Sequence, residues 1–241
     1  MENAITAGLS RQIVLMRALE ATANNVANQT TAGFKAEHVA FREYLARVPA
    51  DRDSDVSLVF DPDSYADFSP GGLEQTHNAL DFAIDGDGFF AVESVEGVLY
   101  TRDGRFSTNE VGELVTRDGG RVLDPAGAPI LLDVEAGPPL LSPDGALLQN
   151  GVPVAALGVF EFDDPRALER RGDNRFRTTG EAKPAAAPRL SQGFIETSNV
   201  EAVAAMTDLV EINRAYEQAA RVVETADELA REAVRRLSEN A

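Results

Sequence analysis

The sequence contains no cysteine and no tryptophan among its 241 residues. Without cysteine the chain can form no disulfide, no thiolate nucleophile and no cysteine-ligated metal site. This absence is compatible with any compartment, so it does not locate the protein. No window approaches 18 consecutive apolar residues, so we expect no helix that spans a bilayer.

A cleavable secretory signal is also missing. Residues 1–4 (Met-Glu-Asn-Ala) lack a basic n-region, and no unbroken apolar stretch follows them. We therefore expect a cytoplasmic protein, or one that leaves the cell by a route that needs no cleaved signal.

Positive charge is scarce, because 22 Lys and Arg residues face 40 Asp and Glu residues, for a net charge of −18. Residues 36–197 hold −15 of this charge. An acidic surface repels nucleic acid and anionic membranes, so we expect neither as a partner. The apolar fraction of 44%, with 12 Phe and 4 Tyr, is sufficient for a folded core.

Motifs that would mark an enzyme are absent as well, among them Gly-x-Ser-x-Gly, Gly-x-x-x-x-Gly-Lys and Gly-x-Gly-x-x-Gly. His38 and His77 have no neighbouring set of zinc ligands and no serine relay. A calcium loop starting at Asp81 lacks the glutamate required at its twelfth position. Asp85 and Asp87 are explained by Asp-Gly turns rather than by acid–base chemistry. We expect no catalysis, no cofactor, no metal and no small-molecule substrate.

Residues 3–27 predict a helix of about 24 residues, because a mostly apolar seam recurs at alternating steps of four and three. Asparagines at positions 24, 25 and 28, followed by residues 30–33 (Thr-Thr-Ala-Gly), are typical of a helix end. The seam consists of Ile5, Leu9, Gln12, Met16, Leu19, Ala23 and Val26.

Residues 198–241 predict a second, longer helix. Ser198 and Glu201 fit a capping box, and no glycine or proline follows residue 194. Its seam is rich in alanine, so each member buries little area and the two terminal helices stabilise one another only weakly. The seam consists of Ala202, Ala205, Leu209, Ile212, Tyr216, Ala219, Val223, Ala226, Ala230, Ala233 and Leu237.

The middle of the chain favours antiparallel β-structure. Asp-Gly recurs at 85–86, 87–88, 103–104, 118–119 and 144–145, and Asn-Gly at 150–151; both pairs suit tight hairpin turns. Residues 49–70 and 180–188 read as loops. The predicted strands cover residues 89–92, 98–101, 113–116, 121–123, 130–132 and 154–162.

These patterns predict an α+β fold in which the N- and C-terminal helices pair as a coiled-coil-like stalk beside a central antiparallel all-β domain. We expect residues 1–35 and 198–241 to form the helical domain, residues 36–75 to be an extended connection, and residues 76–197 to form the β domain. An ordinary two-helix appendage packed on its own β domain would fit the periodicity equally well.

Three stretches resemble one family. Residues 23–35 (Ala-Asn-Asn-Val-Ala-Asn-Gln-Thr-Thr-Ala-Gly-Phe-Lys) resemble the signature that ends the first helix of flagellar rod and hook proteins. Residues 80–90, with Tyr-Thr-Arg-Asp-Gly at 100–104, resemble the start of their β domain. Residues 192–200 and 214–217 resemble the entry and middle of their last helix. Gln29 and Ala32 depart from the residues common at those positions.

The resemblance implies a structural subunit of the flagellar basal-body rod, located in the periplasmic rod and exported by the flagellar export apparatus without a cleaved signal. Its implied partners are other rod subunits, joined through terminal helices that form a torque-transmitting tube. The short chain and residues 8–12 (Gly-Leu-Ser-Arg-Gln) are more similar to proximal-rod than to distal-rod members, although a distal-rod subunit stays open. A secreted β-rich binding or adhesion module is the alternative from another class.

We expect the helices to be loosely paired or mobile in the free subunit and to complete their burial on assembly. In the same way, we expect Asn24, Asn25 and Asn28 to cap or cross-link helix ends, and Gly33 to permit the turn that follows. The predicted assembly interface consists of Ile5, Leu9, Met16, Leu19, Asn24, Asn25, Asn28, Thr31, Gly33, Phe34, Ser198, Asn199, Leu209, Ile212, Tyr216 and Val223.

Overall fold

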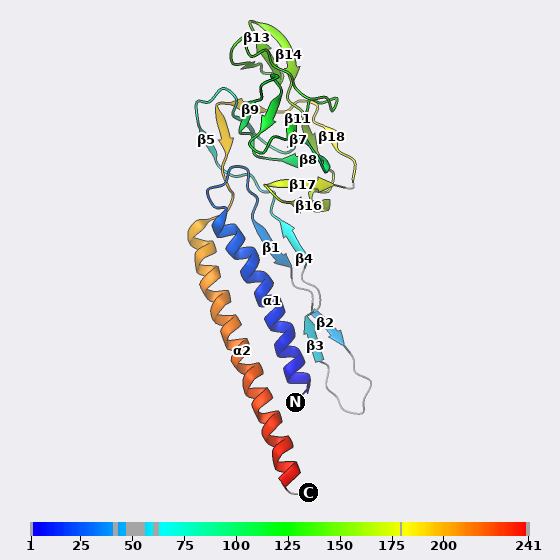
Figure 1. The fold of residues 1–241 in the computed structure, drawn as a ribbon, viewed down its shortest axis with the longest axis vertical. Coiled ribbons are helices and arrows are strands. Elements are labelled where there is room, and N and C mark those ends of the chain that lie inside the picture. The colour runs from blue at the N-terminus through cyan, green and yellow to red at the C-terminus, as the bar shows by residue number, and fades with distance from the viewer. Residues whose placement is uncertain (1, 41–42, 47–55, 60–62, 179, 240–241) are drawn as a thin grey trace. The chain divides into compact units, whose positions relative to one another are not determined.

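The computed structural model describes residues 2–40, 43–46, 56–59, 63–178 and 180–239 (Figure 1). It confirms an α+β fold, with two terminal helices and strands whose ladders are all antiparallel in the described part of the chain. Contacts group the chain into a helical unit (residues 1–27, 37–67 and 201–241) and a β-rich unit (residues 28–36 and 68–200). The segment 28–36 thus groups with the strands, whereas most of it was expected to group with the helices.

The helical unit is built on α1 (Glu2–Ala27) and α2 (Ala202–Glu239), which lie side by side (Figure 1). The prediction of a helix over residues 3–27 is confirmed. Among its described side chains, the face of α1 that is buried carries Val14, Ala18 and Ala21. These residues do not belong to the predicted seam, so the face buried within the chain differs from the face that carries the seam.

The start of α2 corrects the predicted capping box. The helix begins at Ala202, and its first hydrogen bond runs from the Ala205 amide to the Glu201 carbonyl at 2.9 Å. The Ser198 hydroxyl instead accepts the amide of Val200, two residues on, at 3.2 Å. Ser198 therefore closes a local turn before the helix, because such a bond competes with N-capping.

Strands accompany α1 where a connection was expected. β1 (Glu37–Ala40) pairs with β4 (Asp63–Ala66), and β2 (Glu43–Ala46) pairs with β3 (Val56–Val59). Both β1 and β3 contact α1. The loop expected over residues 49–70 therefore contains β3 and β4, and its residues 49–55 and 60–62 lie outside the described part of the chain.

The β-rich unit contains one large sheet in the order β16-β17-β8-β7-β11-β10-β9, with β15 also paired to β7, and β18 to β15. Smaller ladders are β12-β13-β14, β19-β6 and β20-β5. The elements are β5 (Leu73–Gln75), β6 (Phe82–Ile84), β7 (Phe89–Ser94), β8 (Gly97–Thr101), β9 (Phe106–Thr108), β10 (Leu114–Thr116), β11 (Arg121–Val122), β12 (Leu140–Leu141), β13 (Ala146–Gln149), β14 (Val152–Ala156), β15 (Val159–Glu161), the 3-10 turn η1 (Pro165–Ala167), β16 (Leu168–Arg171), β17 (Arg175–Thr178), β18 (Lys183–Pro184), β19 (Leu190–Gln192) and β20 (Phe194–Glu196).

The core of this unit is apolar and partly aromatic. Phe90 and Phe106 meet edge to face with ring centroids 5.2 Å apart, a favoured aromatic geometry. Residues 130–132 were predicted as a strand but contain only one isolated bridge, from Leu131 to Glu113, although Ile130 and Leu132 are both buried. The core cluster consists of Phe82, Ile84, Phe90, Val92, Phe106, Leu114, Val122, Ile130, Leu132, Leu147, Leu157 and Val159.

Two of the glycine turns illustrate different physical reasons for glycine. Asn150 and Gly151 both have positive φ angles, 53° and 78°, as a type I′ turn requires, and they join β13 to β14 as predicted. Gly104 is not in a hairpin, because β8 and β9 do not pair with each other. A Cβ added there would lie 1.6 Å from the carbonyl oxygen of Phe82, so close backbone approach requires glycine.

Candidate functional site

An apolar stripe on α1 is exposed. Leu9, Ile13 and Met16 follow one another at steps of four and three, so they share one helix face. Each side chain is between 47% and 58% exposed. The predicted seam residue Leu19 is half-buried, and the side chain of Ile5 lies outside the described residues. Leu9, Ile13 and Met16 therefore lie on a different side of α1 from the residues that are buried within the chain.

Two further stripes are exposed on α2. Val203, Met206 and Val210 share one face near its start, and they are 47% to 81% exposed. Val222 and Leu229, seven residues apart, lie on another face and are 56% to 61% exposed. Scattered exposed apolar residues are ordinary on a surface, but aligned sets on one element indicate a surface that is covered by a partner.

The predicted seam of α2 faces inward. Leu209, Ile212, Tyr216 and Val223 are all half-buried, and Ala205 and Ala219 in the same series are buried. The two helices approach closely, since a Cβ added to Gly8 of α1 would lie 2.6 Å from Cγ2 of Val223.

The asparagines that end α1 differ in their environment. Asn25 is buried, and its side-chain amide accepts from the Glu37 amide and donates to the Glu37 carbonyl, both at 2.8 Å. This pair of bonds imitates a strand ladder and fixes the first residue of β1. Asn24 is half-buried and reaches the Glu37 carboxylate at 3.5 Å. Both asparagines therefore contact the strand that follows them.

The predicted turn after α1 is confirmed. Thr31 donates its amide to the Asn28 carbonyl at 3.0 Å and its hydroxyl to the Asn28 side-chain oxygen at 3.1 Å. Gly33 has φ +66°, and a Cβ there would lie 2.4 Å from the backbone of Arg102 and Asp103. Glycine is thus required for two independent reasons, its left-handed backbone and the close approach of a second chain segment.

The residues after Gly33 insert into the β-rich unit. Phe34 is buried, with the Arg170 guanidinium 4.7 Å from its ring centroid. Arg170 also donates to the Lys35 carbonyl, and Asn174 donates to the Ala32 carbonyl at 3.0 Å. The signature segment is therefore held by β16 and by the turn that follows it.

A buried ion cluster completes this attachment. Lys35 Nζ lies 2.6 Å from Glu196 Oε1, and Arg102 Nη1 lies 3.2 Å from Glu196 Oε2. The side chains of Lys35, Glu196 and Arg102 are 0%, 2% and 4% exposed. Two cations thus share one carboxylate in a site closed to water. Burial lowers the pKa of Arg102 from its usual value, and the neighbouring Glu196 opposes this effect.

Arg102 is buried, although it directly precedes the Asp-Gly pair at 103–104, and it donates to the Gly86 carbonyl at 2.7 Å. Arg105 is partly buried and pairs with Asp103 at 2.7 Å. The ion cluster was missed altogether, although Lys35, Arg102 and Glu196 all lie in the stretches that carry the family resemblance.

Asn199, which precedes α2 in the chain, links two other segments of the β-rich unit. Its side-chain oxygen accepts the Ala36 amide at 2.7 Å, and its amide nitrogen donates to the Ser69 hydroxyl at 3.0 Å. Its own backbone amide donates to the Phe34 carbonyl at 3.4 Å. Asn199, like Asn25, Gly33 and Phe34, is therefore engaged within the chain, while Leu9 and Met16 remain open to a neighbour.

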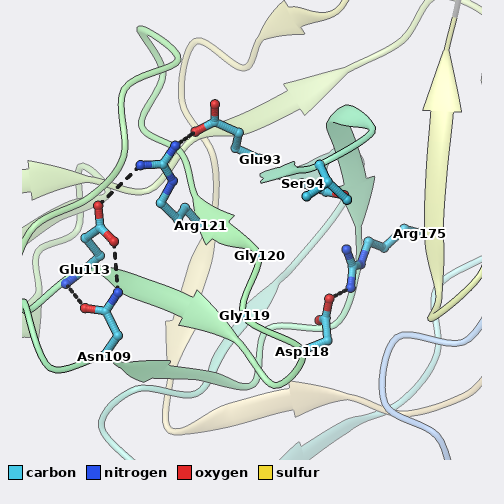
Figure 2. Close-up of a pocket in the computed structure, with 10 residues that line it drawn as sticks. Glu93, Ser94, Asn109, Glu113, Asp118, Gly119, Gly120, Arg121 and Arg175 are labelled. Atoms are coloured by element: carbon cyan, nitrogen blue, oxygen red, sulfur yellow. Dashed lines mark hydrogen bonds and ion pairs between the residues drawn. The ribbon is translucent and has the colours of Figure 1, made fainter.

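A polar cleft of about 500 Å³ lies elsewhere on the β-rich unit (Figure 2). Arg121 bridges Glu93 at 2.7 Å and Glu113 at 3.5 Å, and Arg175 pairs with Asp118. These five are the charged side chains that line the cleft, and each is paired with another of them. A ligand would have to break an existing ion pair to bind there.

Neither a metal site nor a membrane helix is found in the described ranges. No three His, Asp or Glu side chains are grouped there so as to hold an ion. Neither α1 nor α2 has an apolar stretch that could cross a bilayer.

Comparison with known proteins gives consistent results. The family model described as flagellar basal body rod FlgEFG protein C-terminal matches residues 191–236, and the model described as flagellar hook protein FlgE/F/G D1 domain matches residues 83–154. The flagellar basal-body rod protein FlgF of Caulobacter vibrioides is 41% identical, covering 98% of both chains. FlgF of Mesorhizobium japonicum is 38% identical over 98% of both chains. FlgG of Bacillus subtilis is 28% identical over 97% of this chain and 98% of its own.

Proposed function

Because this chain belongs to the family of flagellar basal-body rod proteins, we propose that it is a structural subunit of the rod that polymerises through α1 and α2. The exposed stripes on these helices, such as Leu9, Ile13 and Met16, carry the proposal. Covering the remaining exposed area of one such side chain contributes roughly 1 kcal/mol, so several together drive association.

The directions of the stripes favour a helical tube over a closed dimer. One stripe lies on α1, and two lie on different faces of α2. A single partner helix covers one face, so several neighbours are needed to cover all three stripes. Contacts between different surfaces of identical or homologous subunits form a ring where the rotation between subunits closes and a helical polymer where it does not, and we infer the helical polymer for this chain. Such a tube transmits torque because each subunit is held from several sides.

The pairing of α1 with α2 supplies the axial element of this polymer. We infer that the two helices form a coiled-coil-like stalk, whose alanine-rich seam includes Ala205 and Ala219. Small seam residues bring the helices close but bury little area, so the free subunit is only loosely paired here. Assembly then completes the burial, with Leu209, Ile212, Tyr216 and Val223 held on the inner side.

The partners that follow from this function are other rod subunits, with export through the flagellar export apparatus and no cleaved signal. The stronger similarity to the two FlgF proteins than to the Bacillus FlgG supports a proximal rather than a distal place in the rod. The same similarities favour a rod subunit over the secreted binding module considered above, and a structural role over an enzymatic one.

A pair of substitutions on α2 tests the proposal. Val210→Asp places a charge in the exposed stripe, whereas Asn213→Asp places the same charge at an exposed polar position of the same helix. We expect Val210→Asp to abolish rod assembly and motility in cells while the melting temperature of the purified subunit is unchanged. Asn213→Asp should assemble normally. Normal motility of the Val210→Asp strain would contradict assembly through these stripes.

A further inference from the structure

The chain passes between the helical and β-rich units at residues 27/28, 36/37, 67/68 and 200/201. Three segments of the β-rich unit adjoin these crossings, namely residues 28–36, 68–72 and 196–200. The three segments are far apart in sequence. The side chains of Glu196 and Asn199, both in the third segment, nevertheless bind the first and the second segment.

Glu196 makes contacts through its side-chain carboxylate and through its backbone carbonyl. Its Oε1 accepts from Lys35 Nζ at 2.6 Å and from the Gly71 amide at 2.9 Å, and its Oε2 accepts from Arg102. Its backbone carbonyl accepts the Gly33 amide at 2.7 Å. One residue therefore contacts the first segment twice, the second segment once, and the loop after β8.

Asn199 and Lys35 close the remaining links. Asn199 joins Ala36 to Ser69, as described above, and Lys35 Nζ also donates to the Ser69 carbonyl at 2.7 Å. The three segments are thus cross-linked to one another by a single cluster, in which Lys35, Arg102 and Glu196 are buried and Asn199 is half-buried. These four residues are called the clamp below.

We propose that the clamp is the device through which this subunit carries mechanical load, with the buried Glu196 as its central positioning residue. The inference rests on the proposed rod function. Force that is transmitted along the chain from one unit to the other runs through these crossings. If the crossings were not linked to one another, each of them could be displaced by itself. Cross-linked crossings share the force, because none can move unless the Glu196 contacts break together.

The chemistry of the cluster suits this role better than apolar packing would. Apolar contacts are non-directional and allow sliding, whereas charge-assisted hydrogen bonds lose energy steeply with distance and angle. Exclusion of water strengthens these bonds and makes an unpaired member costly. Gly71 must also be a glycine for this fit, since a Cβ there would lie 2.0 Å from the Thr197 carbonyl oxygen.

The experiment compares Glu196→Gln, which preserves shape and removes charge, with Glu169→Gln, a matched change at a 65% exposed carboxylate paired with Arg171. Asn199→Ala is the second clamp variant, which leaves the ion cluster in place. For cells that carry each variant, the number of flagellated cells is counted in dilute medium and in medium thickened with methylcellulose. Amide exchange of Gly33, Ala36 and Gly71 is followed in the purified full chain.

We expect both clamp variants to build rods in dilute medium at the number seen for Glu169→Gln, and to lose flagella several-fold in the thickened medium. Exchange of the three amides should rise about a hundredfold in Glu196→Gln and should not rise in Glu169→Gln. Equal losses in both media, or no extra loss under load, would overturn the inference. Should Glu196→Gln fail to fold, Asn199→Ala decides by the same comparison. Failure of the rod function itself is recognised separately, by normal motility of Val210→Asp.

Discussion

Lys35 Nζ and Glu196 Oε1 lie 2.6 Å apart, although 161 positions separate the two residues in the chain. The contact joins the end of the helix-terminating signature to the strand that precedes α2. Arg102 contacts the same carboxylate at 3.2 Å, so two buried cations bind the one carboxylate of Glu196. This arrangement determines how the members respond to substitution.

Glu196→Gln should therefore destabilise the protein more than Lys35→Met. The first leaves two buried cations without their carboxylate, and we expect a loss of about 3–5 kcal/mol in unfolding free energy. The second leaves Glu196 paired with Arg102, and we expect about 1–3 kcal/mol. Urea unfolding followed by circular dichroism measures both. Lys183→Met, at an exposed ion pair with Asp163, is the control and should leave the unfolding free energy nearly unchanged. A larger loss for Lys35→Met than for Glu196→Gln would contradict this account.

Gly33→Ala should be far more damaging than an alanine at an unobstructed glycine. At Gly33 the backbone has a positive φ angle, which disfavours a residue with a Cβ, and the new Cβ would also clash with the backbone of Arg102. We expect a loss of about 2–4 kcal/mol in unfolding free energy. Gly127 has φ +84° with no atom within 4 Å of an added Cβ, so Gly127→Ala isolates the conformational term at about 1 kcal/mol. Equal losses in denaturant unfolding would show that the close approach contributes nothing.

The contact between Gly8 and Val223 can be tested by a double-mutant cycle. Gly8→Ala places a Cβ 2.6 Å from Val223 Cγ2, so we expect it to separate the helices and lower the thermal stability of the helical signal. Val223→Ala removes the obstructing methyl groups. The double variant should recover part of the loss, with a coupling energy of about 1 kcal/mol. Strictly additive effects would indicate that the helices do not approach here in solution.

Substitutions at two neighbouring positions of α1 should affect assembly in one case and folding stability in the other. Met16→Asp alters the exposed stripe, so we expect the stability of the purified subunit to change by no more than about 0.5 kcal/mol while rod assembly is lost. Val14→Asp buries a charge on the inward face and should lower the stability of the subunit itself by several kcal/mol. Chemical unfolding and counts of assembled rods measure the two effects. The reverse pattern would mean that the inward and outward faces are exchanged.

Alkaline pH should weaken the β-rich unit through Tyr100. Burial beside Phe160 and Phe162 raises the pKa of Tyr100 above its usual value of 10.0. The neutral phenol is thus favoured in the folded state, so its contribution is intact below the unfolded pKa and is lost as pH rises through the folded pKa. We expect unfolding midpoints to fall above about pH 10, and the fall to be smaller in Tyr100→Phe. A Tyr100→Phe variant with an unaltered pH profile would contradict this assignment.

The terminal helices were predictable because their pattern is long and local. The described members of the α2 seam, from Ala202 to Ala226, are buried or half-buried as the periodicity indicates. On α1 the same reasoning selected the outward face, since hydrophobic patterning weights Leu9 and Met16 above Ala18 and Ala21. A single sequence does not show which of two apolar faces is buried within the chain and which is left exposed.

The ion cluster could not be predicted for a different reason. Lys35, Arg102 and Glu196 are individually unremarkable, and lysine, arginine and glutamate are almost always exposed. Only the three-dimensional fold brings them together. The strands that were missed, such as β16 and β17, are polar and lack flanking Asn-Gly or Asp-Gly pairs, so neither alternation nor turn residues indicated them.

The position at which Phe34 and Lys35 bind in the β-rich unit has a consequence for the order of folding. Phe34 and Lys35 lie near the start of the chain, but their contacts come from Arg170 and Glu196, near its end. Contacts of such long sequence separation form slowly, because the intervening chain must first be brought to closure. The early segment therefore stays unattached until the last strands are in place, and its docking is a late step that closes the β-rich unit.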